Sequence, residues 1–208
     1  GKLENRNALI TGGDSGIGRA AAIAYAREGA NVAIQFYPGE EQDAEEVKEL
    51  IEKEGVKSLL LPYDLREEKA AAKIVEDTVE AFGQLDILVL NAGQQIAQES
   101  LSELSMEQIE DTFKVNIISM FESVKAAEKY LPAGSTIVTT TSVQATNPST
   151  HLMDYAATKG AITNFTINLA KYFAEKGIRV NGVAPGPIWT PLQLDDGQPD
   201  GVIPKFGQ

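Results

Sequence analysis

A tyrosine and a lysine four positions apart, Tyr155 and Lys159, are the residues of this chain best suited to acid–base chemistry. On a helix, this spacing puts both side chains on one face. A phenol has an ordinary pKa of about 10, and a neighbouring ammonium group lowers that value because it stabilises the phenolate. The hydroxyl of Ser142, upstream, is suited to binding a carbonyl oxygen. Tyr-x-x-x-Lys pairs also occur on surface helices, so the rest of the chain decides the weight of this pattern.

A glycine-rich turn near the N-terminus connects an apolar run to a helical pattern. Glycines allow a tight turn and let a ligand approach the backbone closely. The N-terminus of the following helix offers free N–H groups and a positive dipole end to a pyrophosphate. A turn without a ligand is the alternative, but a position between the first strand and the first helix favours a dinucleotide site. The predicted coenzyme contacts in this turn are Gly12, Asp14, Ser15, Gly16, Ile17 and Gly18.

A third polar residue, Asn116, lies on the apolar stripe of a predicted helix, between Phe113 and Met120. A buried amide needs hydrogen-bond partners. Backbone groups would give it a structural role, and groups of a reaction site would give it a chemical one. Both interpretations fit the position of Asn116.

The order of these motifs resembles that of the short-chain dehydrogenase/reductase family, in particular its bacterial glucose/ribitol dehydrogenase-like and general-stress oxidoreductases. The resemblance covers essentially the whole chain. The glycine spacing is Gly-x3-Gly-x-Gly, and the further stations are Asp64, Asn91-Ala92-Gly93, Asn116, Ser142, Tyr155 to Lys159 and Pro185 to Thr190. It implies reversible hydride transfer between NAD(P)(H) and a carbonyl or alcohol substrate.

The resemblance also implies a role for each matched residue. Tyr155 is then the general acid and base, Lys159 also holds the nicotinamide ribose, and Asn116 holds a water of a proton relay. Asp64 would contact the adenine, although a helix N-cap explains this residue equally well. Beyond the glycine-rich turn, the implied coenzyme contacts are Phe36, Asp64, Leu65, Asn91, Ala92, Gly93, Tyr155, Lys159, Pro185, Gly186, Ile188 and Thr190.

The sequence around the second predicted strand bears on the choice of coenzyme. NAD sites usually place an acid at the end of this strand, where it binds the ribose 2′-hydroxyl. Phe36 stands there, which weakens an NAD-only interpretation. Ser15 stands where NADP-preferring relatives often carry a basic residue, and Glu40 and Glu41 would repel a 2′-phosphate if they faced it. We expect NADP(H) or NAD(H), with NADP(H) slightly favoured.

The elements that must position these residues alternate along the chain. Short, continuous apolar runs are typical of strands buried on both faces of a parallel sheet. They predict strands at Ala8–Thr11, Val32–Phe36, Ser58–Leu61, Ile87–Leu90, Thr136–Thr140 and Arg179–Val183. Helices are predicted at Gly16–Glu28, Glu40–Glu54, Asp64 to about Phe82 (with Asp64-x-x-Glu67 as a capping box), Ser105–Leu131 and Asp154–Lys176, and residues 193–208 have no helical pattern. The expected fold is α/β, a doubly wound parallel sheet (Rossmann fold) in a single domain over residues 1–208. The family's seventh strand would lie past Gln208, which leaves an exposed edge beside the sixth strand.

Composition excludes several other classes of function. The chain has no cysteine and one histidine, so we expect no metal site. A net charge of −12 without a basic stripe argues against binding to nucleic acids or membranes. No apolar run reaches the length of a membrane span, and we expect a cytoplasmic protein. By the resemblance, it pairs as a homodimer or homotetramer through the helices at 105–131 and 154–176.

Two other functions remain open at this point. One is an epimerase or dehydratase of the extended family, which the glycine spacing and short chain argue against. The other is a nicotinamide-binding sensor, which would commonly have lost the tyrosine or the lysine. The substrate, an aldehyde, a ketone or a sugar-like molecule, would meet Gln94, Gln95, Ser149, Thr150, His151 and Trp189.

Overall fold

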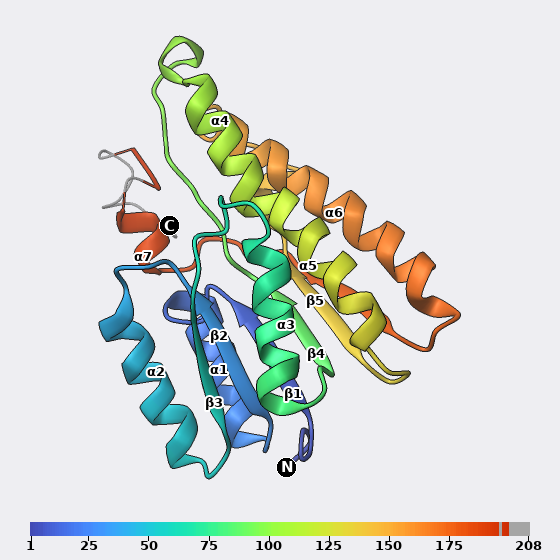
Figure 1. Cartoon of the computed structure of the whole chain (residues 1–208). Helices are drawn as coiled ribbons and strands as arrows, with labels where there is room; N and C mark the ends of the chain where they lie inside the picture. The colour runs from blue at the N-terminus through green and yellow to red at the C-terminus, as the bar shows by residue number, and fades with distance from the viewer. Residues whose placement is uncertain (196, 200–208) are drawn as a thin grey trace.

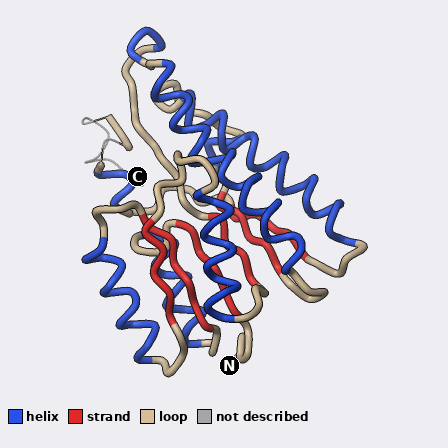
Figure 2. Tube along the Cα trace, in the orientation of Figure 1, coloured by secondary structure: helices blue, strands red, loops and turns tan. Residues whose placement is uncertain are grey.

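The fold is known from a computed structural model, which describes residues 1–195 and 197–199. Strands and helices alternate along most of the chain (Figures 1 and 2). The strands are β1 (Asn7–Thr11), β2 (Asn31–Phe36), β3 (Ser58–Pro62), β4 (Ile87–Leu90), β5 (Thr136–Thr140) and β6 (Arg179–Val183). The helices are α1 (Gly16–Arg27), α2 (Glu41–Lys53), α3 (Ala70–Phe82), α4 (Met106–Phe113), α5 (Ser119–Ala127), α6 (Met153–Ala174) and α7 (Pro191–Leu194).

The six strands form one parallel sheet in the order β3-β2-β1-β4-β5-β6. The chain winds outward from β1 in one direction and then from β4 in the other. This reversal opens a crevice at the carboxyl ends of β1 and β4, which is where open α/β sheets bind ligands. The doubly wound α/β fold predicted from the sequence is therefore confirmed, with all six strands at their expected positions.

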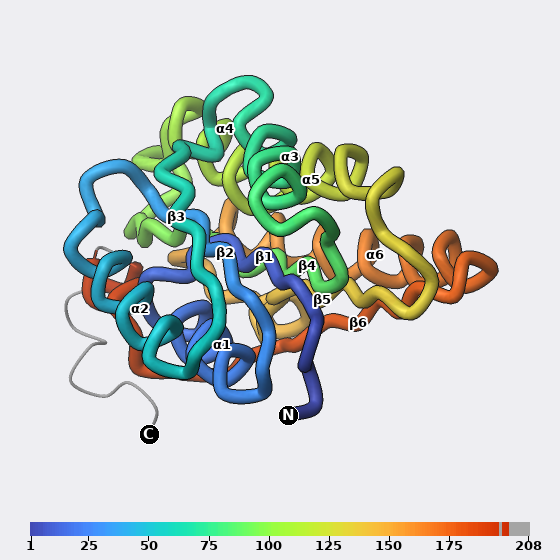
Figure 3. The backbone as a smooth tube through the Cα atoms, turned by 60° about the horizontal axis from the view of Figure 1, so that its bottom comes forward, coloured from blue at the N-terminus to red at the C-terminus, as the bar shows by residue number. Residues whose placement is uncertain are grey.

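Helices cover both faces of the sheet, because alternate strand residues point to opposite sides. Ala8 and Ile10 of β1 pack with α1 and α2, whereas Leu9 between them packs with α3, α5 and α6. Figure 3 shows α1 and α2 on one side of the sheet and α3 and α5 on the other. In the described ranges, no helix is long and apolar enough to cross a membrane.

The capping box predicted at Asp64 is wrong. Helix α3 begins only at Ala70, after a turn in which Lys69 adopts a φ of 66°. The Asp64 carboxylate instead accepts hydrogen bonds from the backbone N–H of Arg66, at 2.9 Å, and from its guanidinium group. Arg66 therefore provides the hydrogen-bond donors for the Asp64 carboxylate, which does not cap the helix. The chain makes a further turn before α3 starts.

The long helix expected from Ser105 to Leu131 is interrupted. Ser105 caps it as predicted, since its hydroxyl accepts from the N–H of Gln108 at 3.0 Å. Residues Lys114–Ile118 then form a π-helical turn between α4 and α5. Such turns are frequent at functional sites, and this one contains Asn116. Helix α7 is also unexpected in part, because it includes Gln193 and Leu194; residues 196 and 200–208 of the predicted tail lie outside the described residues.

Candidate active site

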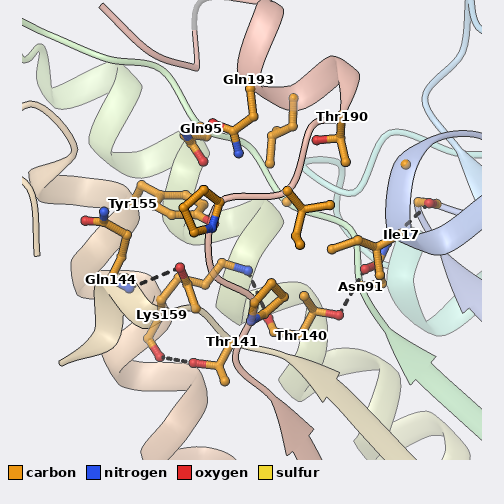
Figure 4. Close-up of a pocket in the computed structure, with 18 of the residues that line it drawn as sticks. Ile17, Asn91, Gln95, Thr140, Thr141, Gln144, Tyr155, Lys159, Thr190 and Gln193 are labelled. Atoms are coloured by element: carbon orange, nitrogen blue, oxygen red, sulfur yellow. Dashed lines mark hydrogen bonds between the residues drawn. The ribbon is translucent and has the colours of Figure 1, made fainter. Parts of the chain in front are cut away.

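A pocket lies at the carboxyl end of the sheet, where the predicted motifs meet. Its walls come from the loops after β1, β4, β5 and β6 and from the first turns of α6. Figure 4 shows Tyr155, Lys159 and Gln144 on one side of it and Ile17 and Thr190 on the other. Ile17 lies more than a hundred positions from the other residues in the sequence, and the parallel sheet brings them together because its strands end at one edge.

Tyr155 and Ser142 form the polar centre of the pocket wall. Tyr155 is only 7% exposed, and the side chain of Ser142 lies close enough to its phenol to influence the pKa. Burial raises the pKa of Tyr155, and the nearby Ser142 hydroxyl offsets this rise only in part. The phenol is therefore protonated at neutral pH, as a proton donor must be. The sequence had predicted a pKa lowered by a neighbouring ammonium group. That prediction fails for this structure, because burial of the phenol dominates its pKa. Lys159 Nζ lies 5.3 Å from the ring centroid and donates its hydrogen bond to Thr140.

Lys159 is almost completely buried next to Tyr155. Its Nζ donates a hydrogen bond of 2.9 Å to the carbonyl oxygen of Thr140, at the end of β5. The side chain is 2% exposed, and burial lowers its pKa to about 8 because the charged form loses hydration. A cation is thus held at the floor of the pocket at neutral pH, at a cost in stability.

This cost makes the stability of the protein depend on pH. Between pH 8 and its ordinary pKa of 10.5, Lys159 binds a proton in the unfolded chain but not in the folded one. Stability therefore rises with pH across this window. Relative to Lys159→Met, we expect the wild type to gain about 3 kcal/mol between about pH 7 and about pH 10.5. Urea denaturation of both proteins over this range measures the difference, and parallel curves would contradict it.

Asn116 is fully buried and has protein partners for its amide. Its Nδ2 donates to the carbonyl of Gln94 at 3.0 Å and to Thr158 Oγ1 at 3.1 Å, and its Oδ1 accepts from the N–H of Gln94 at 2.7 Å. The structural interpretation of this residue is therefore confirmed. A Cβ on Gly93 would lie 3.7 Å from Asn116 Oδ1 and 3.8 Å from Lys159 Nζ, so both polar groups face the same glycine.

The glycine-rich turn leaves an open cradle in front of α1. Gly12 and Gly16 have φ values of 61° and 54°, a region that other residues rarely adopt. A Cβ on Gly18 would lie 2.0 Å from the carbonyl oxygen of Gly12 and 2.7 Å from Asn91 Nδ2. Asn91 Nδ2 in turn contacts the carbonyls of Thr11 and Gly12, both at 3.3 Å, and its Oδ1 accepts from Thr140 at 2.9 Å. Asn91 thus ties the turn to β5.

The remaining predicted coenzyme residues fall into two groups. Thr190 packs against Gly16, since a Cβ on Gly16 would lie 3.2 Å from the Thr190 side chain. The pocket lining includes this residue together with Gly12, Ser15, Gly16, Ile17, Asn91, Ala92, Gly93, Pro185, Gly186 and Ile188. The structure puts the others outside that lining, namely Asp14, Gly18, Phe36, Asp64 and Leu65. Of these, Asp64 is held by Arg66, and this hydrogen bond lowers the pKa of Asp64.

The profile of the short chain dehydrogenase family matches residues 6–200. The chain belongs to this family. The oxidoreductase YhxD of Bacillus subtilis is 61% identical over 208 residues, all of this chain and 70% of that protein. NADPH-dependent aldehyde reductase 1 of Arabidopsis thaliana is 46% identical over 92% of this chain and 68% of that protein. A Burkholderia cenocepacia short chain dehydrogenase, solved in complex with NADP, has a TM-score of 0.89 and 37% identity over 92% of this chain and 78% of that one. The chain is an NAD(P)-dependent oxidoreductase.

The substrate side of this short-chain dehydrogenase differs from the prediction. Of the predicted residues, Gln95 lines the pocket, whereas Thr150 and His151 line a separate small pocket beside Ser100. Sequence analysis missed several other lining residues. Among them are Gln144, Leu152, Gln193 and Gln198. No local pattern marks them, because each comes from a loop or helix end whose position depends on the whole fold.

A buried acid next to Tyr155 in the sequence was also missed. Asp154 is 5% exposed, and in the described part of the chain it makes no ion pair. Its Oδ2 accepts from Thr112 Oγ1 at 2.7 Å and from Gln108 Nε2 at 3.2 Å. Gln108 Nε2 also donates to the carbonyl of Ile96, at 3.0 Å. Asp154 therefore joins the start of α6 to α4 and to the loop after β4.

Replacing Asp154 with alanine leaves the hydroxyl of Thr112 and the amide of Gln108 buried without this acceptor. We expect a loss of about 3 kcal/mol in the free energy of unfolding. The control, Glu110→Ala, removes an exposed acid from α4, the helix that carries Gln108 and Thr112. It should change stability by less than about 0.5 kcal/mol. Chemical denaturation of both variants measures this contrast, and equal small effects would disprove the anchoring role of Asp154.

Proposed function

We propose that this short-chain dehydrogenase reduces the carbonyl group of an aldehyde, ketone or sugar-like substrate, and catalyses the reverse oxidation of the alcohol. The observation that carries the proposal is that Ser142, Tyr155 and Lys159 line the same pocket as the glycine-rich turn. Tyr155 and Lys159 lie across that pocket from Ile17 (Figure 4). A proton donor, a hydroxyl that orients the carbonyl and a buried cation are the groups that this reaction needs.

The glycine-rich turn fits a dinucleotide. Backbone at Gly12 and Gly16 has a conformation suited to glycine, and the absence of a Cβ at Gly18 lets α1 pack closely against Gly12 and Asn91. Free N–H groups at the start of α1 would hold the pyrophosphate. Asn91, Ala92, Gly93, Ile188 and Thr190 would flank the nicotinamide half. When bound, the coenzyme supplies the hydride for reduction or accepts it in oxidation.

The side chains of this protein would transfer the proton to and from the substrate oxygen. Ser142 and Tyr155 would bind the carbonyl oxygen, and Tyr155 Oη would donate its proton to that oxygen as the alcohol forms. In the reverse direction, Tyr155 Oη accepts the alcohol proton. Lys159 would hold a positive charge near the phenolate and contact the ribose, and Asn116 would support the return of the proton from solvent through a water molecule.

For the coenzyme, we propose use of NADP(H) or NAD(H), with NADP(H) slightly preferred. Support comes from the relatives, since one is named for its dependence on NADPH and a solved neighbour contains NADP. Phe36 at the end of β2 supplies no acid that would select the 2′-hydroxyl of NAD(H).

We further propose a cytoplasmic homodimer or homotetramer that pairs through α5 and α6. Apolar side chains are exposed along these two helices, including Phe121 and Ile167, which are 49% and 53% exposed. Phe121 also stacks on Phe165 of α6, with ring centroids 3.9 Å apart. A self-complementary apolar face of this kind is typical of subunit contacts.

A carbonyl screen tests the proposed reaction. Purified protein is incubated with NADPH or NADH and a panel of aldehydes, ketones and aldoses, and oxidation of the coenzyme is followed by its absorbance. We expect turnover with at least one carbonyl class. Tight binding of a coenzyme without turnover of any carbonyl would instead favour the sensor, and a coenzyme that copurifies and does not exchange would favour an epimerase.

A further inference from the structure

The first turn of α6 carries Tyr155 but begins with an apolar residue at its N-cap position. This residue is Leu152, whose side chain cannot accept a hydrogen bond from the helix. The first N–H groups of a helix have no partner within it, so an uncapped first turn depends on other elements for its position. Proton transfer by Tyr155 requires a closely defined position, because donor and acceptor must approach to about 3 Å.

Asp154 supplies contacts of this kind on the side of the helix that faces α4. Adjacent residues of a helix point about 100° apart, and Asp154 lies outside the described pocket lining that includes Tyr155. Its Oδ2 accepts from Thr112 Oγ1 at 2.7 Å and from Gln108 Nε2 at 3.2 Å, and α4 lies alongside the start of α6 (Figure 1). Since a carboxylate can only accept, Asp154 determines the direction of both hydrogen bonds.

Thr112 and Gln108 extend these contacts to the loop after β4. Thr112 gives its single hydroxyl proton to Asp154 and accepts from Gln94 Nε2 at 3.2 Å. The Nε2 of Gln108 donates to Asp154 and to the carbonyl of Ile96, the latter at 3.0 Å. Both side chains are buried, so water does not compete for these bonds. The hydroxyl and the amide nitrogen therefore each bridge α6 and this loop.

The loop residue between these two attachment points is Gln95. It is 4% exposed and lines the pocket together with Tyr155. Its neighbours on both sides, Gln94 and Ile96, are the residues bound from α4. The same hydrogen bonds thus reach the segment that carries the phenol and the segment that faces it across the substrate side of the pocket.

We propose that Asp154 is a positioning residue for the reaction. Through Thr112 and Gln108, it holds the first turn of α6 and the loop after β4 at a fixed separation. It thereby sets the distance between Tyr155 Oη and a carbonyl group bound beside Gln95. Asp154 acts through α4 and touches neither substrate nor coenzyme. This inference rests on the proposed function, because it concerns the proton transfer assigned there to Tyr155.

Thr112→Val removes the hydroxyl that joins Asp154 to Gln94 and keeps the shape of the side chain. We expect the single-turnover rate with a saturating carbonyl substrate to fall by about 10- to 100-fold, because a small displacement of the proton donor slows the reaction steeply. The dissociation constants of NADPH and NADH should stay within about twofold, since the glycine-rich turn is unchanged. Thr112→Ser keeps the hydroxyl and should restore the rate to within about threefold of the wild type.

Thr78→Val is the matched control. Thr78 is also fully buried in a helix, α3, and its hydroxyl donates to the carbonyl of Ile74 at 2.7 Å. This variant loses a buried hydroxyl away from the pocket, so its single-turnover rate should stay within about twofold of the wild type. Urea denaturation compares the stability of both variants. A rate loss in Thr78→Val as large as that in Thr112→Val would overturn the inference, because any loss of a buried hydroxyl would then have the same effect.

A double-mutant cycle tests whether Thr112 and Asp154 act together. The rate loss in the variant that combines Thr112→Val with Asp154→Ala should be smaller than the product of the two single losses, because the second change removes a contact already lost. Losses that multiply fully, or a Thr112→Val protein with the wild-type rate, would overturn this inference alone. A wild type that turns over no carbonyl would overturn the proposed function and this inference with it.

Discussion

Tyr155→Phe is expected to reduce turnover by about 10²- to 10⁴-fold while the dissociation constants of the coenzymes change little. The variant keeps the aromatic ring that packs in the pocket wall and loses only the hydroxyl that the Ser142 side chain contacts. Without that hydroxyl, the carbonyl oxygen has no positioned proton donor. Since the ring remains, the fold and the coenzyme cradle should persist.

Single-turnover kinetics and coenzyme titrations on the same preparation separate the two effects. Tyr172→Phe is the matched control, because it removes a hydroxyl from the exposed side of the same helix α6, and its turnover should stay within about twofold of the wild type. A Tyr155→Phe protein that turns over at the wild-type rate would show that this phenol is not the proton donor.

Gly18→Ala is expected to weaken coenzyme binding by more than about 100-fold and to lower the free energy of unfolding by about 3 kcal/mol. The added Cβ would lie 2.0 Å from the carbonyl oxygen of Gly12 and 2.7 Å from Asn91 Nδ2. The first of these atoms is backbone, so the turn itself must move. Movement of the turn displaces the N–H groups proposed to hold the pyrophosphate.

Gly160→Ala provides the matched control. Gly160 lies inside α6, and a Cβ there meets no atom within 4 Å. Because alanine is more favourable than glycine in the interior of a helix, this variant should be more stable by about 0.5–1 kcal/mol and bind coenzyme normally. Thermal unfolding and coenzyme titration of both variants give the comparison. Normal coenzyme binding by Gly18→Ala would contradict the proposal that the glycine-rich turn binds the coenzyme pyrophosphate.

The sequence was sufficient to predict the sheet and the groups at its carboxyl edge. Strands of a parallel sheet are buried on both faces and therefore appear as continuous apolar runs. The glycine-rich turn and the Tyr155 to Lys159 spacing are recognisable because the geometry of one turn or one helix relates residues that are close in sequence. Each of the six strands lies where its apolar run predicted it.

What the sequence could not predict depends on contacts between distant segments. The π-helical turn around Asn116 has no sequence pattern of its own, and Asn116 there bonds with Gln94, 22 positions away. Such features require the tertiary structure, because they arise from electrostatics and packing rather than from periodicity.

Transfer of deuterium from reduced coenzyme labelled at C4 of the nicotinamide tests the central claim most directly. With a carbonyl substrate from the screen, and with each C4 position labelled in turn, we predict that one labelled coenzyme yields an alcohol with deuterium on the former carbonyl carbon, as detected by mass spectrometry. The proton on the new hydroxyl should come from solvent through Tyr155. An alcohol without deuterium from either labelled coenzyme would contradict direct hydride transfer and, with it, the function proposed for this protein.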